Sequence, residues 1–208
     1  MEKISSSLLF RFDKSAIIGS AAIGLAVAFL LPLIAKNVAV EIPYQNILRI
    51  AFPILSVAGL YVAYFLSRFV SFLYQAAKFV LVGVLNTAID FGVSNFLIAL
   101  SGIAVGFQVD FFKGIGFSVA VINSYFWNKF WVFEKKEGGG AKEFSQFFVV
   151  SIVGLGINVA VAHVVINIIG RAVGLTAGQW ANVGFLVATL ASLVWNFLGY
   201  KLWVFKRK

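Results

Sequence analysis

The sequence has no cysteine and few charged residues, and both absences restrict what the protein can be. None of its 208 residues is cysteine, which excludes a disulfide framework, a thiolate nucleophile and a cysteine-based zinc or iron–sulfur site. Only 12% of the residues are charged, whereas 61% are hydrophobic, and the mean hydropathy is +0.96. Soluble domains usually carry about 25% charged residues. The composition therefore predicts an integral membrane protein.

Long apolar runs alternate with short polar segments along the chain. An α-helix needs roughly 20 residues to cross about 30 Å of hydrocarbon. The runs are too long for the ten-residue alternation of a membrane β-barrel. The first is also too long for a cleaved signal sequence, and a second follows at once. We therefore expect an all-α integral membrane fold with six transmembrane helices, near residues 16–35, 50–67, 77–100, 112–133, 147–169 and 180–204.

The basic residues are divided unevenly between the two sides of this arrangement. Of the 17 Lys and Arg residues, the side without the termini carries only Lys36, Arg49, Lys113 and Arg171. Because cytoplasmic loops retain Lys and Arg, both termini are expected in the cytoplasm, in a multi-pass protein of the cell membrane. The net charge of +9 then favours anionic membrane lipid as a partner. Nucleic acid is not an expected partner, because no soluble basic domain is present to bind it.

An internal repeat organises the second half of the chain. With an offset of 68, residues 78–98 match residues 146–166, and residues 116–128 match residues 184–196. The second copy then carries four extra residues before its Trp-Val-Phe, which is about one helical turn. Each copy is a hairpin of two membrane-spanning helices, so the copies are parallel repeats and not inverted ones.

The repeat sets the expected domains. We expect an N-terminal transmembrane hairpin at 1–73 and a four-helix domain at 74–208. Within that domain, repeat 1 covers about 77–133, a flexible glycine-containing linker covers 134–145, and repeat 2 covers about 146–205.

Polar residues inside the predicted spans are candidates for function, because an acid at the centre of a membrane helix costs about 2.5–3.5 kcal/mol. Asp90 is the only acidic residue deep in a span, with Asn86 and Ser94 one turn away on the same face. The repeat places Asn158 at the position of Asp90. The polar stripes of both copies are expected to converge on one cleft, mostly toward the cytoplasmic half.

Structural roles for the same residues stay open. Ser, Thr and Asn in membrane helices commonly form interhelical hydrogen bonds of about 0.6 kcal/mol. Asp90 could be a protonated structural residue or an ion-pair partner of Lys78 or Lys129. Trp131 and Trp203 are expected to be anchors at the membrane surface. The following glycines are expected at close helix contacts: Gly83, Gly92, Gly154, Gly156 and Gly184.

Three motifs carry a resemblance to a known family. FVLVGVLNTAIDF (79–91), VINSYFWNKFWVF (121–133) and VATLASLVWNFLGYKLWVF (187–205) resemble the GtrA-like family of small membrane proteins. The resemblance covers about residues 77–208 and implies a four-helix domain, so the N-terminal hairpin is an addition to the family pattern. It also implies a role in cell-surface polysaccharide assembly, as a flippase for a sugar carried on polyprenyl phosphate, beside a membrane glycosyltransferase.

A lipid-linked sugar requires hydroxyl and amide partners for the sugar and a cation for the phosphate. The candidate substrate-binding residues are Asn86, Asp90, Ser124, Asn128, Lys129, Asn158, Ser192, Asn196, Tyr200 and Lys201. Lys129 and Lys201 are the candidate phosphate ligands. The alternative is an anchor that dimerises or positions a partner glycosyltransferase, and a homo-oligomer fits either role. We expect no enzyme, because no nucleophile can be paired with a base, and hence no catalytic residue, metal or cofactor.

Overall fold

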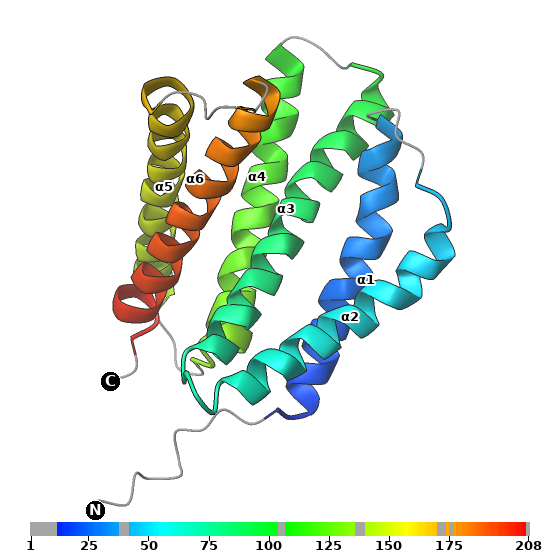
Figure 1. Cartoon of the computed structure of the whole chain (residues 1–208). Helices are drawn as coiled ribbons and strands as arrows, with labels where there is room; N and C mark the ends of the chain where they lie inside the picture. Colours follow the sequence, from blue (N-terminus) through cyan, green and yellow to red (C-terminus); the bar gives the residue numbers. More distant parts are fainter. Residues whose placement is uncertain are drawn as a thin grey trace, which may run out of the picture. The chain divides into compact units, whose positions relative to one another are not determined.

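The computed structural model describes residues 12–37, 42–103, 107–135, 140–169, 174 and 177–206, and within them the regular secondary structure is all helical. Six helices follow one another (Figure 1): α1 (Lys14–Asn37), α2 (Gln45–Leu66), α3 (Leu73–Ser101), α4 (Phe107–Trp127), α5 (Gly140–His163) and α6 (Ala177–Gly199). Short π-helical segments extend three of them: η2 (Asn128–Val132), η3 (Val164–Ile168) and η4 (Tyr200–Val204). The expected all-α class and the number of helices are confirmed.

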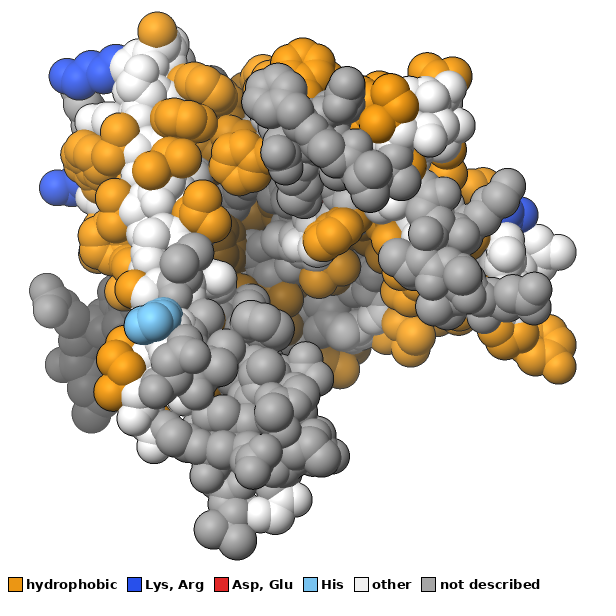
Figure 2. All heavy atoms as spheres, turned by 90° about the horizontal axis from the view of Figure 1, so that it is seen from above, with side chains coloured by type: hydrophobic (Ala, Val, Ile, Leu, Met, Phe, Trp, Pro, Cys, Tyr) orange, Lys and Arg blue, Asp and Glu red, His pale blue; other side chains and the backbone are white. Residues whose placement is uncertain are grey.

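The surface of these helices suits a lipid environment. Helices α1, α2 and α3, and residues 140–158 of α5, are each long and apolar enough to cross a membrane. Large apolar side chains are exposed on them, and in α2 only Leu60 is buried. Figure 2 shows one face of the molecule, where hydrophobic side chains cover much of the described surface and basic side chains lie at its margins. The protein is a membrane protein with several apolar helices.

All six described helices begin earlier than the hydropathy indicates, and α2 and α5 illustrate the difference. Helix α2 starts at Gln45, and α5 starts at Gly140, inside the segment 134–145 that the sequence assigned to a linker. The first turn of α5 is polar, with Glu143 buried in an ion pair to Lys135 at 2.6 Å. Hydropathy locates only the apolar centre of a span, so it misses polar turns of the same helix that extend beyond it.

The chain forms two compact units. Unit 1 is Met1–Glu134 and contains α1 to α4 with η2, whereas unit 2 is Lys135–Lys208 and contains α5, η3, α6 and η4. The N-terminal hairpin thus belongs to the same unit as the first predicted repeat.

Glycines allow the helices of each unit to approach closely. A methyl group added at Gly24 of α1 would lie 2.6 Å from the carbonyl oxygen of Phe52 in α2. A methyl group at Gly92 of α3 would lie 2.8 Å from the Leu30 side chain of α1. Such small residues permit backbone-to-backbone packing in membranes, where burial of apolar surface gives helices little incentive to associate.

The glycine expectation is only partly correct. Gly92 and Gly154 lie at close helix contacts, as expected. By contrast, a methyl group at Gly83 or Gly156 would meet no other described atom within 4 Å, so these two face outward. Gly184 lies outside the residues whose surroundings the structure describes.

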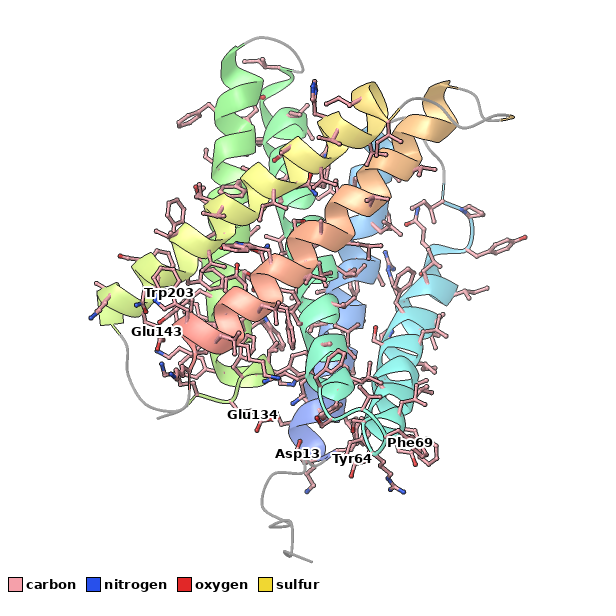
Figure 3. The ribbon with its side chains drawn as sticks, turned by 60° about the vertical axis from the view of Figure 1, so that its left-hand side comes forward. Asp13, Tyr64, Phe69, Glu134, Glu143 and Trp203 are labelled. Atoms are coloured by element: carbon pink, nitrogen blue, oxygen red, sulfur yellow. The ribbon has the colours of Figure 1, made fainter. Side chains whose placement is uncertain are left out.

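Trp131 connects the end of η2 to the first helix. It is only 6% exposed, its indole N–H donates to the carbonyl of Ser15 at 3.1 Å, and its ring packs on Gly19. The expectation of a membrane-surface anchor is therefore wrong for Trp131, because α1 covers it. Asp13 and Glu134 lie at the same end of unit 1 (Figure 3).

The Gly24 contact generates a stability prediction. Gly24→Ala should destabilise the purified protein by about 1–3 kcal/mol, because α1 and α2 must separate to accommodate the methyl group. Gly59→Ala is the matched control, since a methyl group there meets nothing within 4 Å in the described chain. The free energy of unfolding of both variants is measured by SDS titration in mixed micelles. Equal stabilities would contradict the close contact at Gly24.

Candidate functional site

The polar residues of α3 point into its contact with α4. The side-chain oxygen of Asn86 accepts a hydrogen bond of 2.7 Å from the Asn123 amide. Further along α3, the Ser94 hydroxyl donates to the Asp90 carbonyl at 2.8 Å. A methyl group at Gly116 of α4 would lie 3.0 Å from the Asp90 carboxylate. The glycine thus creates the space in which this acid avoids lipid.

Lys78 is not the partner of Asp90. Its ammonium group forms an ion pair of 3.0 Å with Glu134. Twelve residues along one helix separate Lys78 from Asp90, a rise of about 18 Å. That proposed pairing of Asp90 is therefore wrong.

Ser124 and Asn128 are bonded to each other at the end of α4. The Asn128 amide donates to the Ser124 carbonyl at 2.8 Å and to its hydroxyl at 3.1 Å. Asn128 is 1% exposed, and its side-chain oxygen is buried and accepts no hydrogen bond from any residue in the described ranges. The start of η2 therefore contains one buried acceptor, the Asn128 side-chain oxygen, that could accept a hydrogen bond from a ligand.

Lys129 is buried and does not extend to the surface. Its ammonium group donates to the Tyr125 hydroxyl at 3.2 Å and lies 5.5 Å from the centre of the Phe130 ring. In unit 2, the Lys201 ammonium lies 5.4 Å from the centre of the Phe197 ring. Both candidate phosphate ligands therefore lie beside aromatic rings, an arrangement that stabilises a cation in a partly dry site.

The polar residues of unit 2 likewise join its two helices. The Asn158 amide donates to the Ser192 hydroxyl at 3.3 Å. The Ser151 and Tyr200 hydroxyl groups are 2.7 Å apart, and the buried Tyr200 ring stacks on Phe147 with centroids 4.4 Å apart. These bonds close the hairpin along its length.

Asn196 lies against the backbone of α5 at Gly154. Its side-chain oxygen is buried and, among the described residues, has no hydrogen-bond donor. Asn196 matches Asn128 in the repeat, so both copies contain a buried amide oxygen that accepts no bond from the described chain.

The two hairpins pair their helices in different registers. In unit 1 Asn86 is faced by Asn123, whereas in unit 2 the matching residue, Gly154, is faced by Asn196. The offset of 68 would instead place Ala191 there. The second helices are therefore related with a shift of about one turn, which corresponds to the four extra residues of the second copy.

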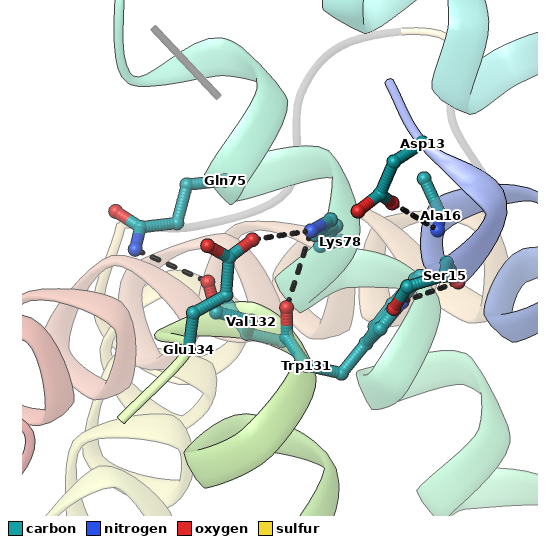
Figure 4. A network of polar contacts seen from close by, with 8 residues as sticks. All are labelled: Asp13, Ser15, Ala16, Gln75, Lys78, Trp131, Val132 and Glu134. Carbon is teal, nitrogen blue, oxygen red and sulfur yellow. Dashed lines mark hydrogen bonds and ion pairs between the residues drawn. The ribbon is translucent and has the colours of Figure 1, made fainter. Parts of the chain in front are cut away.

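Sequence reasoning missed a network at the end of unit 1 (Figure 4). Lys78, 2% exposed, donates to the Trp131 carbonyl at 3.2 Å as well as to Glu134. The Gln75 amide donates to the Val132 carbonyl at 3.2 Å. These donors satisfy carbonyls that the end of a helix leaves without intrahelical partners.

Unit 2 has a similar arrangement built from other residues. Lys135 pairs with Glu143 at 2.6 Å and donates to the Val204 carbonyl at 3.2 Å. Each Trp-Val-Phe ending is thus capped by a lysine that is paired with a glutamate. The requirement for carbonyl partners at a helix end could have suggested such lysines from the sequence.

Chemically, these residues offer amides, hydroxyls, one carboxylate and two partly dry ammonium groups. Such groups can bind a polyhydroxylated ligand and an anion. Among the residues that the structure describes, no group of three His, Cys, Asp or Glu could hold a metal ion. The convergence of both polar stripes on one cleft stays a prediction.

Comparison with known proteins finds relatives of the second part of the chain. Residues 78–205 match the family described as GtrA/DPMS, transmembrane domain. The uncharacterized membrane protein YngA of Bacillus subtilis (strain 168) is 31% identical over 128 residues, which are 62% of this chain and 77% of YngA. No solved structure matches the chain. The matched segment runs from Lys78 in α3 to the residue after η4, and it leaves out α1 and α2.

The Tyr200 contact can be tested by removing one oxygen atom. Tyr200→Phe should lower the stability by about 0.6–1.7 kcal/mol, because it removes the bond to Ser151 and retains the ring stack. Tyr61→Phe is the control, since Tyr61 is exposed on α2. SDS unfolding in micelles compares the two, and a Tyr200 variant as stable as the control would contradict the assignment.

Proposed function

From the premise that the chain belongs to the GtrA/DPMS transmembrane family, we propose that it moves a polyprenyl-phosphate-linked sugar across the cell membrane. The sugar would then serve the assembly of a polysaccharide or other glycan outside the cell. The proposal gives the polar residues of the helix contacts a role in binding the sugar during its passage.

The position of Asp90 carries the proposal. An acidic residue this deep in an apolar helix is costly and is by default a functional candidate. Asp90 lies against Gly116 with Asn86 one turn away, so a carboxylate and an amide are held side by side between two helices. This pair can bind sugar hydroxyls at a depth where lipid tails offer no hydrogen bonds.

The phosphate requires a cation near the membrane surface. Lys129 and Lys201 lie in η2 and η4, at the ends of α4 and α6, beside aromatic rings that exclude water. A phosphate meets such an ammonium group in a less screened setting than it finds on a solvated tail. The buried amide oxygens of Asn128 and Asn196 are acceptors for sugar hydroxyls when the helix ends separate. The polyprenyl tail stays in lipid throughout.

The proposal includes a topology. We propose that α4 and α6 also cross the membrane, giving six crossings in the cell membrane with both termini in the cytoplasm. The charge distribution supports this orientation. The orientation is also supported by unit 1, because the start of α1 and the end of η2, which are both expected on the cytoplasmic side, lie next to each other.

A second function, an anchor for a membrane glycosyltransferase, is favoured by a different observation. Several candidate residues are bonded to one another or to a neighbouring helix, as in the pairs Asn86–Asn123 and Asn158–Ser192. Such bonds serve helix assembly. In this case the protein positions or dimerises the enzyme and moves no substrate itself.

Asp90→Asn distinguishes the two functions. The variant retains an acceptor of nearly the same size but loses the charge, so we expect it to fold normally. It should move lipid-linked sugar about 10-fold more slowly, which corresponds to a rise of about 1.4 kcal/mol in the activation free energy of transport. Purified protein in liposomes with a labelled polyprenyl-phosphate sugar measures the movement. Thermal unfolding is recorded in parallel.

Thr87→Ala is the matched control on the same helix, because the exposed Thr87 hydroxyl bonds only to the Gly83 carbonyl among the interactions described for it. It should transport like the wild type. Undiminished movement by a stable Asp90→Asn protein would overturn the role of the charge. A wild-type protein that moves no sugar would favour the anchor.

Neutralising the two buried lysines tests the phosphate site. Lys129→Gln with Lys201→Gln should weaken binding of a polyprenyl-phosphate sugar by about 10-fold. Neutralising the tail from Lys206 to Lys208 should have a smaller effect, because tail charges are screened over roughly 8 Å. Binding is measured by titration in nanodiscs of neutral lipid. Equal losses of affinity in the two sets of variants would mean that Lys129 and Lys201 contribute only a general electrostatic attraction at the membrane surface.

A further inference from the structure

We propose that Arg49 of α2 binds the phosphate group of a membrane lipid, at the end of unit 1 opposite to η2. Arg49 is the only charged residue among the 22 residues of α2. A charge inside a membrane-spanning helix is costly and is by default a functional candidate whose partner has to be identified. Helix α2 lies outside the segment that matches the family, and the inference does not depend on whether the protein moves a sugar.

The first helix holds the Arg49 side chain in place. Helices α1 and α2 form an antiparallel hairpin in which Gly24 lies against the Phe52 carbonyl. Further along α1, the centre of the Phe29 ring lies 4.8 Å from the Arg49 guanidinium carbon, a geometry that stabilises a cation where water is scarce. One Nη of Arg49 donates to the Asn46 side chain at 3.1 Å. All of these contacts lie within unit 1, so they do not depend on where unit 2 lies.

Most of the N–H groups of Arg49 lack an acceptor. A guanidinium group has five N–H donors and keeps its charge in proteins. One of the five donates to Asn46, and the buried Nε–H has no acceptor among the described residues. The remaining three are on the two Nη atoms, and the described chain supplies no acceptor for them either. Two neighbouring Nη groups form a fork that can bind two oxygens of a phosphate or a carboxylate.

No carboxylate among the described side chains bonds to Arg49. Four acidic residues have described side chains, and each of them lies against another residue of its own unit. The pairs are Asp13 with Ala16, Asp90 with Gly116, Glu134 with Lys78, and Glu143 with Lys135. Arg49 lies four residues after the start of α2, about 6 Å along the helix, and hence near the membrane surface. The anion that a membrane supplies at this level is the phosphate of a lipid headgroup.

This site is distinct from that of Lys129. Ser15, which bonds to the end of η2, is fourteen residues from Phe29 in α1, a rise of about 21 Å. Arg49 and Lys129 therefore lie at opposite ends of unit 1. In the topology proposed above, Arg49 reaches the leaflet that faces away from the cytoplasm. The ligand is a phosphate ester on an apolar tail, supplied either by a phospholipid or by a polyprenyl phosphate.

Binding of short-chain lipids in a detergent without phosphate tests the site. Full-length protein in dodecyl maltoside is titrated with dioctanoyl phosphatidylglycerol, citronellyl phosphate, inorganic phosphate and dioctanoylglycerol, and native mass spectrometry counts the bound molecules. We expect the two phosphate lipids to bind far more tightly than the other two probes, and the preference between them identifies the source of the phosphate. Equal binding of dioctanoylglycerol would mean that the protein recognises only the tail, and equal binding of inorganic phosphate would mean that it recognises only the free ion. Either result would overturn the proposal.

Substitutions of the arginine test its role. Arg49→Gln should weaken binding at one phosphate-lipid site per chain by about 10-fold, and Arg49→Lys should retain only part of the affinity, because an ammonium group lacks the planar fork. Arg68→Gln is the matched control, because it removes the same charge beyond the other end of α2, where the exposed guanidinium lies 5.3 Å from the centre of the Phe65 ring. The comparison is repeated with Lys129→Gln and Lys201→Gln present, so that binding at these lysines does not mask the effect. An Arg68→Gln loss as large as that of Arg49→Gln, or an unchanged affinity of Arg49→Lys, would indicate a general electrostatic attraction and overturn the proposal.

Two further variants separate a preorganised site from local charge. Phe29→Leu removes the ring but no charge, so it should weaken phosphate-lipid binding several-fold, and an unchanged affinity would contradict the preorganised site. Glu41→Gln removes the acid nearest to Arg49 in the sequence and should change the affinity less than about two-fold. A large rise would mean that a carboxylate of the chain itself occupies the fork, which would overturn the proposal. Thermal unfolding in the same detergent verifies that the variants are folded. The readout is binding and not movement, so failure of this proposal is distinguishable from failure of the proposed transport.

Discussion

The buried ammonium group of Lys78 fixes one end of unit 1, where α3, the end of η2 and α1 are joined by hydrogen bonds. Lys78 bonds to the Trp131 carbonyl and to Glu134, and Trp131 in turn bonds to Ser15 of α1. An ammonium group that is 2% exposed is costly to bury unless such partners surround it. The network holds the end of η2 on α3 and α1. Further along the same two helices, Asn123 bonds to Asn86 and Gly116 lies against Asp90.

Unit 2 meets the same requirement with a different set of residues. Lys135 and Glu143 cap the Val204 carbonyl, and Tyr200 closes the hairpin through Ser151. Hydrogen bonds between membrane helices are worth about 0.6 kcal/mol each, so individual bonds hold the helices together and still exchange readily for a ligand. This balance is compatible with a passage for a hydroxylated molecule and equally with a compact anchor.

The two copies of the repeat differ in charge and in the register of their helices. The first has Asp90, and Leu30 of α1 packs on it at Gly92, whereas the second has Asn158 at the position of Asp90. The added N-terminal hairpin does more than increase the number of helices, because α1 packs on α3 and η2 of the first copy. The first copy carries the acid on which the proposed transport depends.

The sequence by itself determined the class of protein, the six helices, the family resemblance and the candidacy of Asp90. These follow from hydropathy and from the cost of an acid in lipid, which depend on each residue and its near neighbours. Only the tertiary structure decided that Lys78 pairs with Glu134, that Asn123 faces Asn86, and that α1 covers Trp131. It also decided that Gly154 packs against Asn196, and that the second helices of the two copies pair about one turn out of register. The reason is physical: the face that a helix buries depends on side chains that are distant in sequence, whereas lipid favours every apolar face almost equally.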